Sequence, residues 1–276
     1  MTSETFTFQR FWNYFKYDLK QLWHNNGKAA IMLGFISVIC YLIWILGSLV
    51  FTGSWNAPGI GARTFFFALG SIILVFYQTR TYGHLTEKQA GQAWLMIPAS
   101  HLEKFVSMML ITILCIPLAY VASYVVLDSL IAWLDPTAGD PIVTGASSLA
   151  QAISSGVSAA SEEGYHFNLG LLAVPLLLQQ IANFLYFLLC GISFKKWKIV
   201  GALAIMLAAS TVITPLFSFF ALHTWSPMLE AYGNGDDPVL IAQFVNTAMN
   251  WGTAFDAFLV IAFAVGIYFR IKTLKH

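Results

Sequence analysis

The chain has 276 residues, of which 58% are hydrophobic and only 10% are charged, and its mean hydropathy is +0.70. Soluble domains usually carry about a quarter charged residues, so this composition excludes a soluble domain with a polar surface and indicates a membrane protein. The net charge of +1 gives no reason to expect a nucleic-acid partner.

Residues 6–24, which precede the first long apolar run, predict an amphipathic cytoplasmic helix. Apolar side chains recur there at spacings of three and four, and polar and basic side chains fill the other side. Such a helix is suited to lie in the headgroup region of a membrane; the alternative is that it packs against its own helix bundle. The apolar face contains Phe8, Trp12, Phe15, Leu19, Leu22 and Trp23, and the opposite face Gln9, Arg10, Asn13, Lys16 and Lys20.

Six apolar segments are long enough to cross the hydrocarbon core of a bilayer, which takes roughly 20 residues of helix. The alternating ten-residue strands of a membrane barrel are absent from the sequence. We therefore predict an all-α integral membrane protein in which residues 1–276 form a single transmembrane domain. The predicted spans are residues 29–51, 62–79, 105–134, 169–194, 199–222 and 252–270.

The basic residues predict the orientation of these spans. With six spans, every lysine and arginine except Arg63 falls on the side of the two termini. Because cytoplasmic loops are enriched in lysine and arginine, we expect both termini in the cytoplasm of a bacterium and the chain in its inner membrane. Residues 135–168 and 223–250 are then extracytoplasmic loops, the first with a weak helix and the second with a turn at 233–238 and a short helix at 239–249.

The cytoplasmic segment 80–104 between the second and third spans carries two sequence patterns of the capping-box type. The first, Thr86-Glu87-Lys88-Gln89, predicts a short helix from Glu87 to about Met96 that Pro98 ends. The second, from Ser100 to Glu103, predicts the start of the third span. The segment is therefore expected to be an ordered helix held between two spans.

The sequence contains no motif of a known catalytic or metal centre. It lacks H-E-x-x-H, G-x-S-x-G, C-x-x-C and a phosphate-binding glycine loop, so we expect no enzyme activity, no cofactor and no metal. Polar residues within spans give the better indication, because each needs a partner away from lipid. Gln179, Gln180 and Asn183 predict either a polar patch on a substrate path or dimer seam, or amides that hydrogen-bond to neighbouring helices. Asp128 and Asp256 are interpreted as carboxylates at headgroup level.

One stretch of a dozen residues resembles a known family. Residues 94–105 read Trp-Leu-Met-Ile-Pro-Ala-Ser-His-Leu-Glu-Lys-Phe, which is similar to the pattern Leu-x-Leu-Pro-x-Ser-x-x-Glu-Lys-Phe of permease subunits of type-2 ATP-binding-cassette (ABC) exporters. The basic turn 194–198 and the ending 268–272 also look like members from Bacteroidetes-type bacteria. The long outer loop between spans three and four departs from many members of that family.

This resemblance implies that the chain is a permease subunit with two partners, an ATPase subunit and a second permease subunit. The amphipathic arm would be an elbow helix, the short cytoplasmic helix would couple to a separate ABC ATPase subunit, and a second permease copy or paralogue would complete the path. ATP hydrolysis would occur on the partner. The alternatives are a non-transport membrane scaffold or regulatory subunit, or a membrane-embedded enzyme, and the substrate stays open. The residues assigned to coupling are Glu87, Lys88, Gln89, Trp94, Pro98, Ser100, Glu103 and Lys104.

Overall fold

The computed structural model describes residues 6–24, 28–162, 170–234 and 238–273. The chain is 89% helical, and no strand occurs among the described residues. Six helical segments are long and apolar enough to cross a membrane, which confirms the predicted number of spans. They are Ile31–Thr52, Ile60–Thr86, His101–Leu134, Ala173–Ser193, Lys198–Leu216 and Gln243–Thr273.

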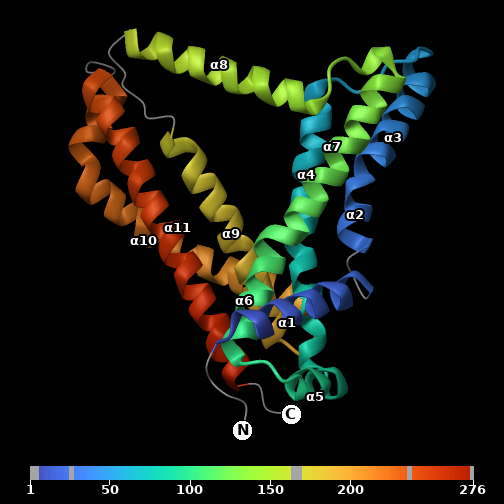
Figure 1. Cartoon of the computed structure of the whole chain (residues 1–276). Helices are drawn as coiled ribbons and strands as arrows, with labels where there is room; N and C mark the ends of the chain where they lie inside the picture. Colours follow the sequence, from blue (N-terminus) through green and yellow to red (C-terminus); the bar gives the residue numbers. More distant parts are fainter. Residues whose placement is uncertain (1–5, 25–27, 163–169, 235–237, 274–276) are drawn as a thin grey trace.

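The helices follow one another with short connections (Figure 1). Among the elements with described bounds, the 3₁₀ turns η2 and η4 and the π-helical segment η3 interrupt the α-helices. In chain order the elements are α1 (Phe8–Leu22), α2 (Lys28–Gly34), α3 (Ile36–Thr52), α4 (Ile60–Thr81), η2 (Gly83–Thr86), α5 (Lys88–Met96), α6 (His101–Leu110), η3 (Ile111–Cys115), α7 (Ile116–Leu134), η4 (Pro136–Ala138), α8 (Ile142–Glu162), α9 (Gly170–Ser193), α10 (Lys198–Asn234) and α11 (Pro238–Thr273).

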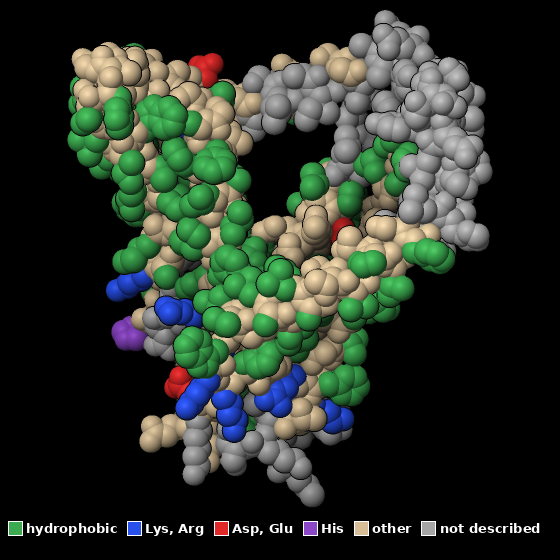
Figure 2. All heavy atoms as spheres, turned by 180° about the vertical axis from the view of Figure 1, so that it is seen from behind, with side chains coloured by type: hydrophobic (Ala, Val, Ile, Leu, Met, Phe, Trp, Pro, Cys, Tyr) green, Lys and Arg blue, Asp and Glu red, His purple; other side chains and the backbone are tan. Residues whose placement is uncertain are grey.

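The spans form two arms that meet at one end of the molecule. Helices α2, α3, α4 and α7 make one arm and α9, α10 and α11 the other, while α8 lies across the far end (Figure 1). Figure 2 shows an open space between the arms, and lysine and arginine side chains gathered at the end where they meet. We call this the basic end; α5 lies there, and α1 lies across the bundle just above it.

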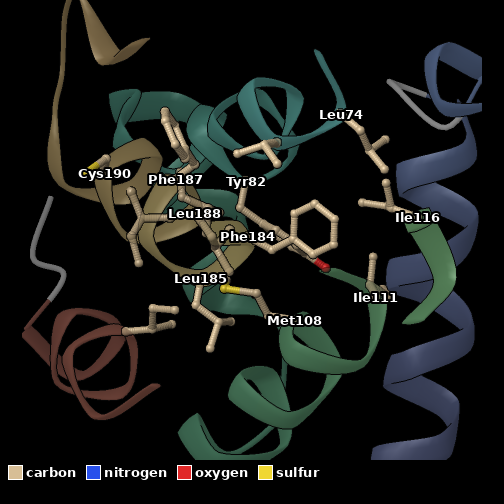
Figure 3. Packing of buried hydrophobic residues seen from close by; sticks show 14 of the residues in the cluster. Leu74, Tyr82, Met108, Ile111, Ile116, Phe184, Leu185, Phe187, Leu188 and Cys190 are labelled. Atoms are coloured by element: carbon tan, nitrogen blue, oxygen red, sulfur yellow. The ribbon is translucent and has the colours of Figure 1, made fainter. Parts of the chain in front are cut away.

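The hydrophobic core lies where the arms join, with side chains from α4, α6, η3 and α9 turned toward one another (Figure 3). Met108, Ile111, Leu185 and Leu188 are completely buried. The close approach of α4 and α9 depends on Gly191, because a Cβ atom there would stand 2.5 Å from the Thr79 carbonyl oxygen. Packing at this junction holds the two arms together.

Helix α1 uses one face for packing and leaves another uncovered. Phe11, Tyr14 and Asp18 are buried against the bundle, which was the alternative interpretation of this helix. Phe8 is 70% exposed and Trp12 is 45% exposed. The location of this uncovered aromatic face at a membrane surface stays a prediction.

The two segments predicted as outer loops are largely helical, and the weak helix expected in the first and the short helix expected at 239–249 are both present as parts of longer helices. Within 135–168, α8 forms a continuous 21-residue helix, whose first backbone N–H, that of Ile142, donates to the Asp128 carboxylate at 2.7 Å. Within 223–250, α10 continues to Asn234 and α11 begins at Pro238. Polar residues beyond the apolar runs do not end a helix, since its backbone hydrogen bonds are internal. Residues 163–169 and 235–237 lie outside the described residues.

Candidate functional site

Helix α5 stands at the basic end, but its start differs from the predicted capping box. Glu87 is the N-cap residue and makes no side-chain capping hydrogen bond. The Thr86 hydroxyl instead donates to the Gly83 carbonyl at 2.9 Å and accepts from Lys198 Nζ at 2.9 Å. The first capping box was therefore wrong, because the threonine is used to hold η2 to the start of α10.

The second predicted capping box is present at the start of α6. The Glu103 backbone N–H donates to Ser100 Oγ at 3.2 Å, and the Ser100 backbone N–H donates to Glu103 Oε2 at 2.9 Å. Two backbone donors that a helix start leaves unpaired are thereby satisfied. This fixes the direction in which the third span leaves the α5–α6 link.

Glu103 also binds α1, which the sequence did not indicate. Arg10 Nε lies 2.7 Å from Glu103 Oε2, Arg10 Nη2 lies 2.8 Å from Oε1, and the Thr7 backbone N–H donates to Oε1 at 3.0 Å. Glu103 is completely buried, and this two-pronged guanidinium contact neutralises its charge. Arg10, predicted on the polar face of a surface helix, therefore joins α1 to the start of the third span.

Lys104 closes the other end of α5. Its ammonium donates to the Trp94 carbonyl at 2.9 Å and to the Leu95 carbonyl at 3.4 Å. It also stands 4.6 Å from the centroid of a Trp94 ring. A lysine that binds the last carbonyls of a helix satisfies acceptors that the helix end leaves unpaired. Because Lys104 belongs to α6, this contact fastens the end of α5 to the third span.

Trp94 connects the same end of α5 to α1. Its indole N–H donates to the Tyr14 hydroxyl at 3.0 Å, and both side chains are buried. The link that follows is short and constrained: Ile97 has the extended backbone (φ −66°, ψ 128°) that a following proline favours, and Pro98 is exposed. Helix α5 is thus tied by side chains to two neighbouring helices.

A buried carboxylate strengthens the contact between α1 and the bundle. Asp18 Oδ2 accepts hydrogen bonds from the Tyr82 hydroxyl at 2.9 Å and from Ser107 Oγ at 2.7 Å. Burial raises the pKa of the Asp18 carboxyl above its ordinary value, while the two hydrogen bonds act in the opposite direction. The sequence analysis missed this residue, since the only sign was a lone acid among aromatic residues.

The other face of α5 is uncovered. Glu87 and Gln89 are exposed, and Met96 is 83% exposed; the side chain of Lys88 is not among those the structure describes. A helix fastened on one side and open on the other can receive a partner and pass its movement to α1 and α6. The assigned residues divide accordingly: Trp94, Ser100, Glu103 and Lys104 hold the helix. Glu87 and Gln89 are exposed, as is Met96, which was not among the assigned residues.

The polar residues within the spans fall into two places. Gln179 is exposed and Gln180 and Asn183 are half-buried on α9, and none of the three amides hydrogen-bonds to another described residue. Asp128 is not an ordinary solvent-facing carboxylate, as its interpretation at headgroup level implied: it is completely buried and pairs with Arg63 Nη1 at 3.1 Å. A buried charge is stable only with such a partner.

Comparison with known proteins identifies no relative: no family model, no curated protein and no solved structure matches the chain. Among the described residues, no group of three or more His, Cys, Asp or Glu side chains is arranged to hold a metal ion. The site is therefore defined by its own geometry, a short helix at the basic end that is fixed to its neighbours on one side.

Proposed function

We propose that this chain is the membrane permease subunit of an ABC-type exporter, which forms the substrate path and couples to a separate ATPase subunit. The observation that carries the proposal is the fastening of α5 through Trp94 and Lys104 to α1 and α6, with its opposite face uncovered. The proposal also rests on the resemblance of residues 94–105 to the loop of that family. The chain itself would hydrolyse nothing.

The mechanism is transmission of a movement by rigid parts. When ATP closes the two ATPase subunits, each would pull on a docked α5. The contact between Lys104 and the Trp94 carbonyl would pass this pull to α6. The Ser100–Glu103 capping box would keep the direction of α6 relative to the segment that joins it to α5. Through Arg10 and Glu103 the same movement reaches α1. Helices α1, α5 and α6 would therefore move as one body.

The proposed orientation places the basic end in the cytoplasm of a bacterium and the spans in its inner membrane, with both termini cytoplasmic. The support is the concentration of lysine and arginine at that end (Figure 2). The exposed aromatic side chains of α1, such as Phe8 and Trp12, would then lie among the headgroups as an elbow helix. A second permease copy or paralogue would face the open space between the arms.

The test is co-purification with ABC ATPase subunits, beginning with any that is encoded beside this chain. We expect a stable complex with the intact chain and none with a variant in which residues 87–96 are replaced by a Gly/Ser linker. A milder pair separates docking from folding: Gln89→Ala with Met96→Ala should weaken the complex without lowering the melting temperature. The matched control, Lys196→Ala with Trp197→Ala in another exposed turn at the basic end, should leave the complex intact.

Failure of the intact chain to bind any ABC ATPase would reject the permease proposal. The non-transport scaffold or regulatory subunit would then be the better hypothesis. Loss of the complex in the control pair as well would show that docking does not depend on α5 in particular.

A further inference from the structure

Helices α9 and α11 pack side by side in the same direction with a nearly constant offset in sequence. The rings of Tyr186 and Phe263 have centroids 5.5 Å apart. Nearer the basic end, Arg270 Nε donates to the Ile192 carbonyl at 3.2 Å. The two pairs are offset by 77 and 78 residues, so the helices stay in register over this distance. In two helices that pack in parallel and in register, residues seven positions apart on each helix return to the line of contact between the helices, which we call the seam.

The same register brings Gln179 to the level of Asp256. Gln179 lies seven residues before Tyr186, and Asp256 lies seven residues before Phe263. Asn183, one turn away from Gln179, belongs to the same side of α9. The patch formed by Gln179, Asn183 and Asp256, which we call the midspan patch, therefore combines two amides with one carboxylate across the α9–α11 seam.

Asp256 lies farther from the start of its helix than the predicted span implied, while its depth in a membrane stays a prediction. Helix α11 begins at Pro238, and its candidate span runs from Gln243 to Thr273, so Asp256 lies near the middle of the span. It precedes Arg270 by 14 residues, which is about 21 Å along a helix at roughly 1.5 Å per residue. A shorter predicted span, 252–270, had left this carboxylate close to its outer end.

Asp256 has no counter-charge among the described residues. The buried carboxylates Asp128 and Glu103 each pair with an arginine, whereas no ion pair or hydrogen bond from a described residue reaches Asp256. Between Lys198 and Arg270 the sequence contains neither lysine nor arginine. An ionised carboxylate within a membrane span is unfavourable in free energy unless it pairs with a positive charge. A ligand that supplies this charge would therefore be favoured.

The patch is open to a ligand on the arm that borders the open space. Ala182 is only 4% exposed, but Gln179, three residues nearer the far end, is exposed. Phe255 and Phe258, close to Asp256 in sequence, are 45% and 63% exposed. Asp256 is therefore a single carboxylate among exposed apolar side chains.

From this arrangement we infer that the midspan patch binds an organic cation with an apolar body, such as an amphiphilic ammonium or guanidinium compound. One carboxylate and neutral amide oxygens suit such a cation, whereas a metal ion would need further ligands that the described residues do not supply there. The apolar body would lie against exposed aromatic rings, which also attract cations. The inference rests on the proposed export function only in making this cation the transported substrate.

The experiment measures equilibrium binding of two probes to the full chain in nanodiscs, with empty nanodiscs as the blank. Tetraphenylphosphonium and tetraphenylborate have similar size and apolar surface but opposite charge. We expect the cation to bind the natural chain more tightly than the anion, and Asp256→Asn to weaken cation binding by about tenfold or more, as the loss of one charge-assisted contact implies. Asp256→Glu should keep most of the affinity, and Gln179→Leu should lower it less.

Asp140→Asn is the matched control, because it removes the same charge from an exposed position at the far end, and it should leave binding unchanged. Size-exclusion profiles and melting temperatures establish that each variant is folded, and Gln179→Leu carries the test if Asp256→Asn is not. Equal cation affinity in the natural chain, Asp256→Asn and Gln179→Leu, or an equal loss for the anion, would overturn the inference. Because the assay needs no ATPase, its failure leaves the coupling proposal standing, and failure of ATPase docking leaves cation binding standing.

Discussion

Lys104 contacts Trp94, in the last turn of α5, in two ways. Its ammonium donates to the Trp94 carbonyl at 2.9 Å and lies 4.6 Å from the centroid of a Trp94 ring. The lysine is 2% exposed. The buried ammonium donates hydrogen bonds to helix-end carbonyls that would otherwise be unpaired. The short helix at the basic end therefore depends on a residue of the neighbouring span.

Lys104→Met is expected to loosen the end of α5 while leaving the rest of the fold in place. Hydrogen bonds from a charged group contribute about 1.5–3 kcal/mol each, part of which is offset by the desolvation of the ammonium. Amide hydrogen exchange should show faster exchange in residues 88–97 and unchanged exchange in α9. Lys196→Met, at an exposed lysine, is the control, and faster exchange in that variant too would contradict the assigned role.

Ser100→Ala should destabilise the protein and Glu87→Ala should not. The first change removes a formed capping interaction, which contributes about 1 kcal/mol, whereas the Glu87 side chain makes no capping hydrogen bond. Exposed substitutions of the second kind usually stay within about 0.5 kcal/mol. Thermal unfolding in one detergent compares the two variants, and an equal loss would mean that both sequence patterns act as caps.

Asp18 is expected to make the stability of the protein fall as pH rises. Its folded-state pKa lies above the unfolded value of about 3.8, so the folded state holds the proton more tightly than the unfolded state. The contribution is complete below the unfolded pKa and is lost as pH rises through the raised folded pKa. Melting temperatures from pH 4 to pH 8 should decline less steeply in Asp18→Asn, and identical slopes would rule out this carboxyl as the source.

Gly191→Ala should weaken the junction of the two arms. The added Cβ would stand 2.5 Å from the Thr79 carbonyl oxygen, so backbone must move, and overpacking of this kind costs about 1–3 kcal/mol. Gly252→Ala provides a matched control in α11, where nothing lies within 4 Å of the new Cβ and alanine suits a helix better than glycine. A melting temperature that falls in the first variant and is unchanged or higher in the second is the expected outcome.

The Arg63–Asp128 pair should show strong coupling in a double-mutant cycle. Arg63→Met alone leaves a buried carboxylate without its partner, which typically costs about 3–5 kcal/mol. The double variant Arg63→Met/Asp128→Leu removes both charges and should be more stable than either single variant. Additive losses would instead indicate that the two residues contribute independently.

The sequence by itself determined the parts of this protein that depend on local composition. Long apolar runs can only be helices in lipid, since every backbone polar group there must be paired within the segment, and six candidate spans are found. The capping box at Ser100 and Glu103 is likewise local, because both residues lie within one turn. Concentrated basic residues predicted which loops share a side, and their grouping at one end agrees with that pattern (Figure 2).

Tertiary structure alone decided which distant residues meet. Arg10 and Glu103 are 93 positions apart, and Arg63 and Asp128 are 65 apart; neither pairing follows from helical periodicity, which relates only residues a few positions apart. The sequence predicted a helix at 239–249, but not that it joins the last span, nor that α10 continues to Asn234, since hydropathy marks where lipid ends and not where a helix ends. Asp256 illustrates the consequence: composition showed a carboxylate near a span, and only the length of α11 and its register with α9 placed it near the middle of that helix, at the level of Gln179.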